Sequence, residues 1–293
     1  MRIGIVGDVH MDWGAHDERW FSECGYDLLL VVGDLASRLR DGRRVARSLA
    51  RLPLPVLVIA GNHDGVRLPL LAAEAFHRDR LSDRLCSAMT GRVAQLERAL
   101  EPVPLGGYSV HRFELDGGPL AVIAARPHSM GGRRLSFRRY LAQRYGVTSL
   151  SESAAHLRML VDTVGDEPLI FLSHNGPTGL GARPHDIWGC DFRPAWGDFG
   201  DPDLREAVDY ALAQRKRVVA VVAGHMHHAV RGGGVRCWHV ERDGVRYVNA
   251  ARVPRIIGRG RGSRHHHLLL TGDDEVAAVR EVWTRPCVCR APD

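Results

Sequence analysis

A chain of 293 residues, of which 45% are hydrophobic and 25% charged, is long and apolar enough for one large globular domain. No apolar run approaches the roughly 18 residues of a membrane span, which excludes an integral membrane protein and a membrane partner. The formal net charge of +6 suits an anionic substrate. The arginines are spread along the chain, however, so nucleic acid is not the favoured partner.

The N-terminal segment and the cysteines predict a cytoplasmic protein. The apolar run at residues 3–7 is broken by Asp8, and no signal-peptide core or cleavage site follows it. The six cysteines lack the spacing of a disulfide framework, so we expect reduced thiols. Cys287 and Cys289 stand two apart near the end, but a pair without two further ligands is weak evidence for a metal site.

Short apolar runs recur along the chain and predict strands buried on both faces, because they are rich in Val, Ile and Leu and lack alternation. These runs are residues 3–6, 28–32, 56–60, 120–124, 169–172 and 218–222. Helix-like stretches lie between some of them, most clearly at 41–52 and 203–215. From about residue 235 the pattern indicates antiparallel strands at 235–241, 245–250, 265–271 and 275–284. The alternation predicts an α/β fold with much parallel sheet, in a single domain over residues 1–293.

Two further stretches, at about 65–118 and 133–165, are predicted as helical insertions. Both follow strands that end in polar clusters, so we expect them to cap a site; the alternative is that they cover a sheet face. On the C-terminal strand at 265–271, the three consecutive histidines His265, His266 and His267 are expected to face solvent.

Polar clusters follow the predicted strands at their carboxyl ends, the edge where open α/β sheets bind ligands. The clusters supply Asp8, His10, Asp34, Asn62, His174, His225 and His227. Imidazole and carboxylate groups without cysteine suit divalent Mn, Fe or Zn. Seven ligands are too many for one tetrahedral ion, but they fit two divalent metal ions, whose mutual repulsion a shared carboxylate would offset. We expect all seven on the rim of one sheet, and His228, which would point away from His227, to be structural.

The order of these motifs resembles the calcineurin-like metallophosphoesterase superfamily. The motifs are Asp8-Val9-His10, Gly33-Asp34, Gly61-Asn62-His63-Asp64, Ser173-His174-Asn175 and Gly224-His225-Met226-His227. Each motif is weak alone, but the joint pattern over residues 8–227 is specific. The resemblance implies a four-layer α/β/β/α sandwich, which agrees with the predicted strands.

The resemblance also implies a role for each residue. One ion would be held by Asp8, His10 and His227, the other by Asn62, His174 and His225, and Asp34 would bridge them. His63 would stand beside the leaving group without binding metal, and Asp64 would orient its ring. The ions would lower the pKa of a bridging water and so provide hydroxide for in-line attack, while His63 would donate a proton to the leaving alkoxide.

A weaker resemblance points to an uncharacterised branch of the superfamily, known mainly from photosynthetic organisms, and rests on residues 126–132, 176–181 and 197–202. Arg126 and His128 follow a strand and are predicted to contact the substrate, because the arginine fork suits phosphate. The alternative is a surface loop with a salt bridge. Asn175 is either a substrate contact or a residue that closes a turn. A further candidate lining of the pocket is the loop that carries Asp186, Trp188, Asp191 and Asp198.

Together these observations predict a dinuclear metal-dependent phosphoesterase that hydrolyses a monoester or diester in a small phosphoester substrate. A nuclease is the alternative among enzymes, and it would need a groove of clustered basic residues. A non-catalytic scaffold is the alternative outside enzymes, but scaffolds of this superfamily have lost site residues that this chain keeps. The sequence leaves the substrate, the native metal and the oligomeric state open.

Overall fold

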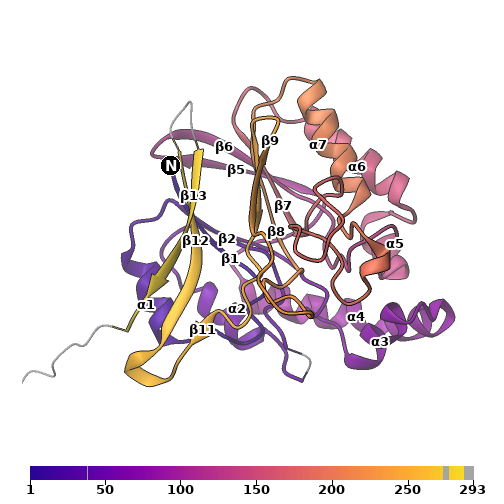
Figure 1. Cartoon of the computed structure of the whole chain (residues 1–293), viewed down its shortest axis with the longest axis horizontal. Coiled ribbons are helices and arrows are strands. Elements are labelled where there is room, and N and C mark those ends of the chain that lie inside the picture. Colours follow the sequence, from indigo (N-terminus) through magenta and orange to yellow (C-terminus); the bar gives the residue numbers. More distant parts are fainter. Residues whose placement is uncertain (38, 273–276, 287–293) are drawn as a thin grey trace, which may run out of the picture.

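Two β-sheets packed face to face, with helices on both outer faces, make up the protein (Figure 1). The computed structural model describes residues 1–37, 39–272 and 277–286. Cys287 and Cys289 lie outside the described residues, as do the first two residues of the strand predicted at 275–284.

The first sheet contains the N-terminal strands in the order β11-β12-β1-β2-β3-β4, with β13 paired to β12. Its parallel members are β1 (Arg2–Val6), β2 (Leu28–Val31), β3 (Val56–Ile59) and β4 (Leu105–Gly106). Its antiparallel members are β11 (Ile256–Ile257), β12 (Arg264–Gly272) and β13 (Ala277–Thr284). The strands predicted at 3–6, 28–32 and 56–60 are therefore confirmed as parallel neighbours.

The second sheet has the order β5-β6-β7-β8-β10-β9. Its strands are β5 (Ser109–Leu115), β6 (Gly118–Ala124), β7 (Leu169–Asn175), β8 (Val218–Gly224), β9 (His239–Arg242) and β10 (Val245–Asn249). Strands β6, β7, β8 and β10 run parallel, and β5 and β9 are antiparallel edges. The prediction that residues 245–250 form only antiparallel pairs is wrong, because β10 also lies parallel to β8.

Side-chain alternation explains why the strands read as continuous apolar runs. Ile3 and Ile5 point into the core between the two sheets, where they meet Ile170 and Val222. Val6, on the opposite face of β1, packs in the outer core of the first sheet. Both faces of each sheet are thus buried, so the central strands are apolar up to their carboxyl ends, where β7 carries polar residues such as His174. The result is the predicted α/β/β/α arrangement, with two sheets flanked by helices.

The helices form the two outer layers. The first sheet is covered by α1 (Ala15–Glu23), α2 (Arg43–Leu49) and part of α4 (Asp79–Leu100). The second is covered by α3 (Leu68–Ala75), the rest of α4, α5 (Arg138–Tyr145), α6 (Leu150–Asp162) and α7 (Pro202–Ala213). Leu157 and Val161 of α6 belong to the same core as Phe171 of β7, so α6 covers a sheet face and is not a cap.

Two sequence-based expectations about local structure are wrong. The helical stretch predicted to reach residue 118 ends at Leu100, because residues 109–115 pair with β6 as an edge strand. His265, His266 and His267 do not face solvent: they are only 6%, 3% and 2% exposed. His265 and His267 pack against Asp17 and Phe21 of α1 on one face of β12, and on the other face His266 packs against His228 and Trp283, so neither face of this histidine run is open.

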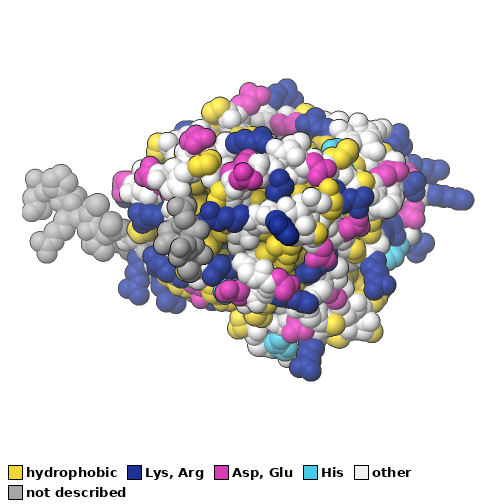
Figure 2. Space-filling model, turned by 90° about the horizontal axis from the view of Figure 1, so that it is seen from above, with side chains coloured by type: hydrophobic (Ala, Val, Ile, Leu, Met, Phe, Trp, Pro, Cys, Tyr) yellow, Lys and Arg dark blue, Asp and Glu magenta, His cyan; other side chains and the backbone are white. Residues whose placement is uncertain are grey.

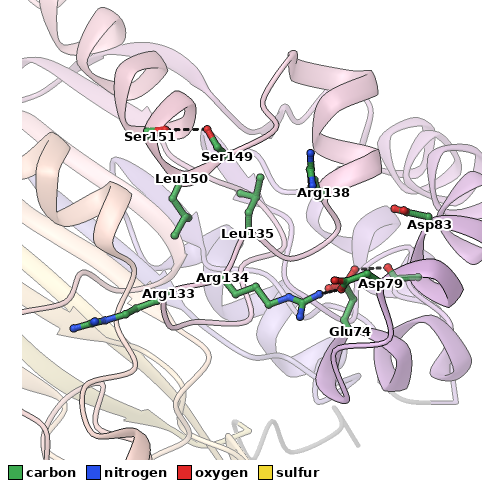
Figure 3. A pocket seen from close by; sticks show the side chains of 11 residues that line it. Glu74, Asp79, Asp83, Arg133, Arg134, Leu135, Arg138, Ser149, Leu150 and Ser151 are labelled. Carbon is green, nitrogen blue, oxygen red and sulfur yellow. Dashed lines mark hydrogen bonds and ion pairs between the residues drawn. The ribbon is translucent and has the colours of Figure 1, made fainter.

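The two helical insertions line an open polar pocket of about 590 Å³ (Figure 3). Residues at 74–83, 133–138 and 149–151 line it, and none of the predicted metal ligands does. On the face of the molecule drawn in Figure 2, basic and acidic side chains are intermixed. None of the helices in the described ranges is long and apolar enough to cross a membrane.

Candidate metal centre

The predicted ligands come together where the carboxyl ends of both sheets meet. Asp8, Asp34 and Asn62 follow β1, β2 and β3 of the first sheet. His174 lies in β7, and His225 and His227 follow β8, in the second sheet. The expectation of a rim on one sheet is therefore wrong, because the apolar runs divide between two stacked sheets whose carboxyl ends meet.

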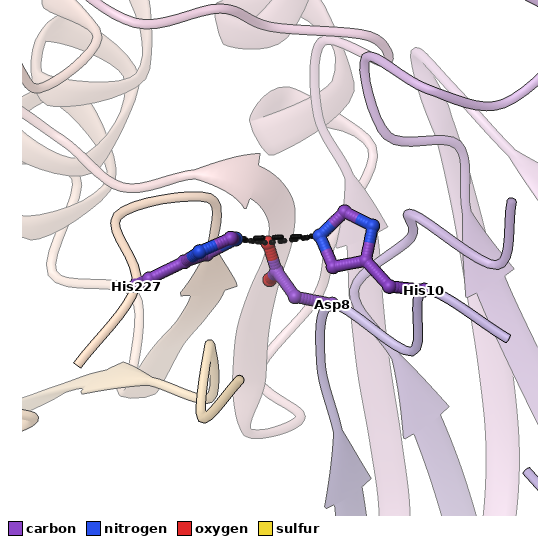
Figure 4. A group of neighbouring side chains, drawn as sticks. All are labelled: Asp8, His10 and His227. Atoms are coloured by element: carbon purple, nitrogen blue, oxygen red, sulfur yellow. Dashed lines mark hydrogen bonds and ion pairs between the residues drawn. The ribbon is translucent and has the colours of Figure 1, made fainter. Parts of the chain in front are cut away.

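One group of donor atoms surrounds the carboxylate of Asp8. His227 Nε2 lies 3.5 Å and His10 Nε2 lies 4.0 Å from Asp8 Oδ1, and the two imidazole nitrogens are 3.3 Å apart. Figure 4 shows the two rings on opposite sides of the carboxylate, with their nitrogens turned toward it. Three donors from two sheets therefore converge on one point, as the sequence predicts for the first ion.

A second group surrounds the amide oxygen of Asn62. His174 Nε2 lies 2.9 Å and His225 Nδ1 lies 3.0 Å from Asn62 Oδ1. Asp34 connects the two groups: its Oδ1 is 3.7 Å from His174 Nε2, and its Oδ2 is 3.6 Å from His10 Nε2. Each oxygen of Asp34 thus faces a different group, an arrangement that suits a carboxylate shared between two ions.

Backbone carbonyls determine which nitrogen each ring offers. The Nδ1 of His174 lies 2.7 Å from the Val32 oxygen, and that of His10 lies 3.2 Å from the Ala36 oxygen. Donation from Nδ1 leaves Nε2 as the free acceptor. His225 is reversed, because its Nε2 lies 3.2 Å from the Met130 oxygen and its Nδ1 faces Asn62. Partners of this kind orient metal-binding histidines in proteins.

The backbone at the ligands is held in the left-handed region that L-residues rarely adopt. The φ angles of Asp8, His10, Asp34 and His225 are 44°, 43°, 49° and 67°. Such conformations cost on the order of 1–3 kcal/mol each and concentrate at functional sites. A glycine is also required at position 61, since a Cβ there would lie 2.2 Å from Asp34 Oδ1.

Electrostatics in the centre follow from burial and from the mutual charges of its groups. Burial would raise the pKa of the Asp34 carboxyl, but the neighbouring His174, His63 and His10 hold it below its usual value. Burial lowers the pKa of His225 to about 3, so its ring is neutral at physiological pH. An ionised carboxylate and a neutral imidazole are the forms that bind metal ions.

Asp64 does not have its predicted role. Its Oδ1 accepts the Ala36 N–H at 3.0 Å and its Oδ2 accepts the Gly61 N–H at 2.9 Å. No hydrogen bond joins its carboxyl to the ring of His63 among the described residues. Asp64 instead ties together the loops that follow β2 and β3, because both of its oxygens are taken by backbone amides. Burial, followed by the charge of Asp34, raises its pKa to about 7.

The predicted substrate contacts are buried next to the centre. The Arg126 guanidinium is ion-paired with Asp203 at 2.7 Å and with Asp201 at 3.0 Å. His128 Nδ1 lies 2.8 Å from the Gly61 oxygen. Asn175 donates to Asp201 and to the Phe199 oxygen, which agrees with a residue that closes a turn. These partners leave little of the three side chains for a substrate, and their substrate contact stays a prediction.

The loop after His174 is held by its own polar groups. The carboxylates of Asp186, Asp191 and Asp198 accept backbone amides of Arg183, Arg231 and Gly179, respectively. Trp188 is buried against Gly176 and does not line an open surface. His228 is also buried and bonds the Asn249 oxygen, as expected for a structural residue.

Sequence reasoning missed two features of the centre. The Met130 carbonyl orients His225, and a backbone oxygen leaves no signal in residue type. Asp201 bonds three side chains behind the centre, and its only sequence signal is the Gly-Asp-Phe-Gly-Asp-Pro stretch that begins at Gly197.

Comparison with known proteins identifies the fold family. The model of the calcineurin-like phosphoesterase family matches residues 1–229. The chain belongs to this family. No curated protein sequence matches the chain. Among solved structures, TT1561 of Thermus thermophilus is similar at 13% identity, with a TM-score of 0.52 over 95% of this chain and 97% of that one. The phosphopantetheinyl hydrolase PptH of Mycobacterium tuberculosis is 18% identical, with a TM-score of 0.46 over 84% and 87%.

The donor set of this calcineurin-like phosphoesterase fits two divalent ions. Asp8 Oδ1 is buried and has no hydrogen-bond partner, and an unpaired buried carboxylate oxygen is costly unless a cation binds it. Three sets of donor atoms each lie within 4.8 Å of one another, namely Asp8, His10 and His227; His10, Asp34 and His63; and Asp8, Asp34 and His174. Oxygen and imidazole donors without sulfur suit Mn, Fe or Zn.

Proposed function

We propose that the protein is a dinuclear metal-dependent phosphoesterase that hydrolyses a small phosphate monoester or diester. The observation that carries the proposal is Asp34, whose two oxygens face two separate groups of imidazole, amide and carboxylate ligands. Asp8, His10 and His227 would hold one ion, and Asn62, His174 and His225 the other. Bound there, the ions supply the positive charge that polarises a phosphoryl group and activates water.

The protein's own residues complete the reaction site. His63 extends from the loop after β3 with its side chain 14% exposed, and its Nε2 lies 3.9 Å from Asp34 Oδ2. Its backbone N–H bonds Asp34 Oδ1 at 2.8 Å, which fixes the start of the side chain beside the bridge. This position beside Asp34 supports a role for His63 as the proton donor to the leaving oxygen.

The alternatives find less support. A nuclease needs basic side chains gathered along a groove, whereas the arginines of this protein are spread along the whole sequence. A scaffold needs no reactive centre, whereas this chain keeps every ligand, the strained backbone beneath four of them and His63. We therefore favour a small substrate and an active enzyme.

Turnover of p-nitrophenyl phosphate and of bis-p-nitrophenyl phosphate by the Mn²⁺-loaded protein tests the proposal. Asp34→Asn should reduce kcat/KM by at least about 100-fold. Even the loss of a residue that only hydrogen-bonds to a metal ligand typically lowers metal affinity or activity about 10- to 100-fold. Asp41→Asn is the matched control, because this exposed carboxylate pairs with Arg43 on the surface. If wild type hydrolyses neither compound, nor a panel of nucleotides and sugar phosphates, faster than Asp34→Asn, the protein is not a phosphoesterase.

His63 is tested separately from the ligands. His63→Gln should lower kcat by about 100-fold, the range of general acid catalysis, while both ions stay bound. Metal content measured by mass spectrometry separates this result from that of Asp34→Asn. A loss of bound metal in His63→Gln would show that His63 is a ligand and not the acid.

A further inference from the structure

A buried polar network lies behind the metal centre and takes no part in the chemistry proposed above. Asp201 is its hub: its Oδ1 accepts the Ser129 hydroxyl at 2.8 Å, the Asn175 amide at 3.1 Å and the Arg126 guanidinium at 3.0 Å. Arg126 also binds Asp203 through two hydrogen bonds. All five side chains are buried. The network therefore joins the loop after β6, the end of β7 and the start of α7.

One branch of this network leads directly to a metal ligand. The Ser129 Oγ that donates to Asp201 also accepts the Gly131 N–H at 3.1 Å. Met130, between these two residues, presents its carbonyl to His225 Nε2 at 3.2 Å. Because both neighbours of Met130 are fixed by one hydroxyl, the direction of its carbonyl is fixed as well. That carbonyl makes Nδ1 the nitrogen that His225 turns toward Asn62.

The position of Asp201 shows that its side chain serves the network rather than its own helix. Asp201 is the N-cap of α7, where an aspartate normally accepts a backbone N–H of the first turn. Its side chain makes no such cap bond and points inward instead. A cap bond of this kind is worth on the order of 1 kcal/mol, so the inward orientation forgoes an ordinary stabilisation.

We propose that Asp201, held by Arg126, is a positioning residue for the metal centre, which acts through Ser129 and the Met130 carbonyl to set the ring of His225. The inference rests on the metal-binding part of the proposed function. In this proposal Arg126 and Asn175 support the metal centre and do not contact a substrate.

Binding of Mn²⁺ to the metal-free protein, followed by calorimetry, tests the proposal with Ser129→Ala. This variant removes the hydroxyl that fixes Met130, and we expect the affinity for one of the two ions to fall about 10- to 100-fold. Ser153→Ala is the matched control: its hydroxyl is equally buried and bonds Asp203 of the same network, but from α6, away from Met130. Both variants should lower the urea midpoint, and only Ser129→Ala should lower the metal affinity.

The absorption spectrum of the Co²⁺-loaded protein gives a second readout, because it reports ligand geometry directly. Ser129→Ala should shift the visible bands, and Ser153→Ala should reproduce the wild-type spectrum. If Ser129→Ala does not fold, Asp201→Asn replaces it in the test. This substitution keeps the shape of the Asp201 side chain and removes the negative charge that pairs with Arg126. It should bind the affected ion more weakly than Ser153→Ala does.

Two outcomes would overturn the proposal. One is wild-type affinity for both ions in the folded Ser129→Ala or Asp201→Asn protein. The other is an equal loss of affinity in Ser153→Ala, which would make the network a general support of the fold. The outcome is separate from that of the proposed function: a protein that binds two ions and shows the Ser129 effect, but hydrolyses nothing, would refute only the phosphoesterase activity.

Discussion

The molecule buries two groups of histidines that differ in what their ring nitrogens face. At the metal centre, nitrogens of His10, His174, His225 and His227 converge on the carboxylates and the amide between them. On β12, each ring has a partner of its own. His265 bonds Asp17 at 2.9 Å, His266 bonds Glu281 at 3.0 Å and His267 bonds Tyr26 at 2.9 Å.

Backbone geometry accounts for this difference. Consecutive residues of a strand point to opposite faces, so His266 is directed away from His265 and His267 and the three cannot share an ion. The ligands of the candidate metal centre instead lie at the carboxyl ends of five different strands, several of them with left-handed backbone. A buried site that binds metal is marked by convergent, unpartnered donors and not by the number of its histidines.

Removing one histidine from each group gives the largest expected contrast. His174→Ala should reduce kcat/KM by at least about 100-fold and the bound metal by about half, because it deletes a direct ligand. His266→Ala should leave kcat/KM within about twofold and reduce only the stability. Steady-state kinetics and metal analysis of the folded variants check both expectations. Equal losses of activity would mean that the two groups do not differ in function.

A methyl group beside Asp34 should have the next largest effect. Gly61→Ala places a Cβ 2.2 Å from Asp34 Oδ1 and 2.7 Å from His174 Cε1, so the bridge and a ligand must move. Overpacking of this kind costs about 1–3 kcal/mol, and we expect activity to fall more steeply than stability. Gly232→Ala is the control, since a Cβ there meets no atom within 4 Å. Unchanged metal affinity in Gly61→Ala would contradict the crowded geometry.

The buried histidines of β12 should make the free energy of unfolding of the metal-free protein depend on pH in the acid range. Burial lowers the pKa of His267 to about 3 from its ordinary value of 6.5. The unfolded chain therefore binds a proton that the folded one does not, and stability falls as the pH drops below about 6.5. The slope from this residue is up to about 1.4 kcal/mol per pH unit. Urea unfolding at pH 7.5, 6.0 and 4.5 should show a flatter dependence in His267→Gln than in wild type. Parallel curves would show that His267 is protonated in the fold.

The smallest effect is expected from the partner of His267. Tyr26→Phe deletes the phenol oxygen that is hydrogen-bonded to His267 Nε2 at 2.9 Å. A hydrogen bond of this type contributes about 1 kcal/mol, so the urea midpoint should fall slightly. Metal content and kcat/KM should match wild type. A change in either would show that this hydrogen bond acts on the metal centre through β1, with which β12 pairs.

Much of the fold and most of the site could be predicted from the sequence. The strands were recognisable because both of their faces are buried, which turns each into an unbroken apolar run such as residues 28–32. The ligands were recognisable because they directly follow these runs. The assignment of strands to two sheets was not recognisable in this way, because a run buried on both faces reads the same in either sheet.

The sequence by itself therefore determined the strands, the set of candidate metal ligands and the family. The local sequence pattern is enough for these, since a buried strand is an apolar run and the candidate ligands directly follow such runs. Only the tertiary structure decided that Arg126 meets Asp201 and Asp203, that Asp64 bonds backbone amides and that the β12 histidines are buried. Each of these outcomes depends on a partner distant in sequence, and the type of a residue does not specify which distant segment packs against it.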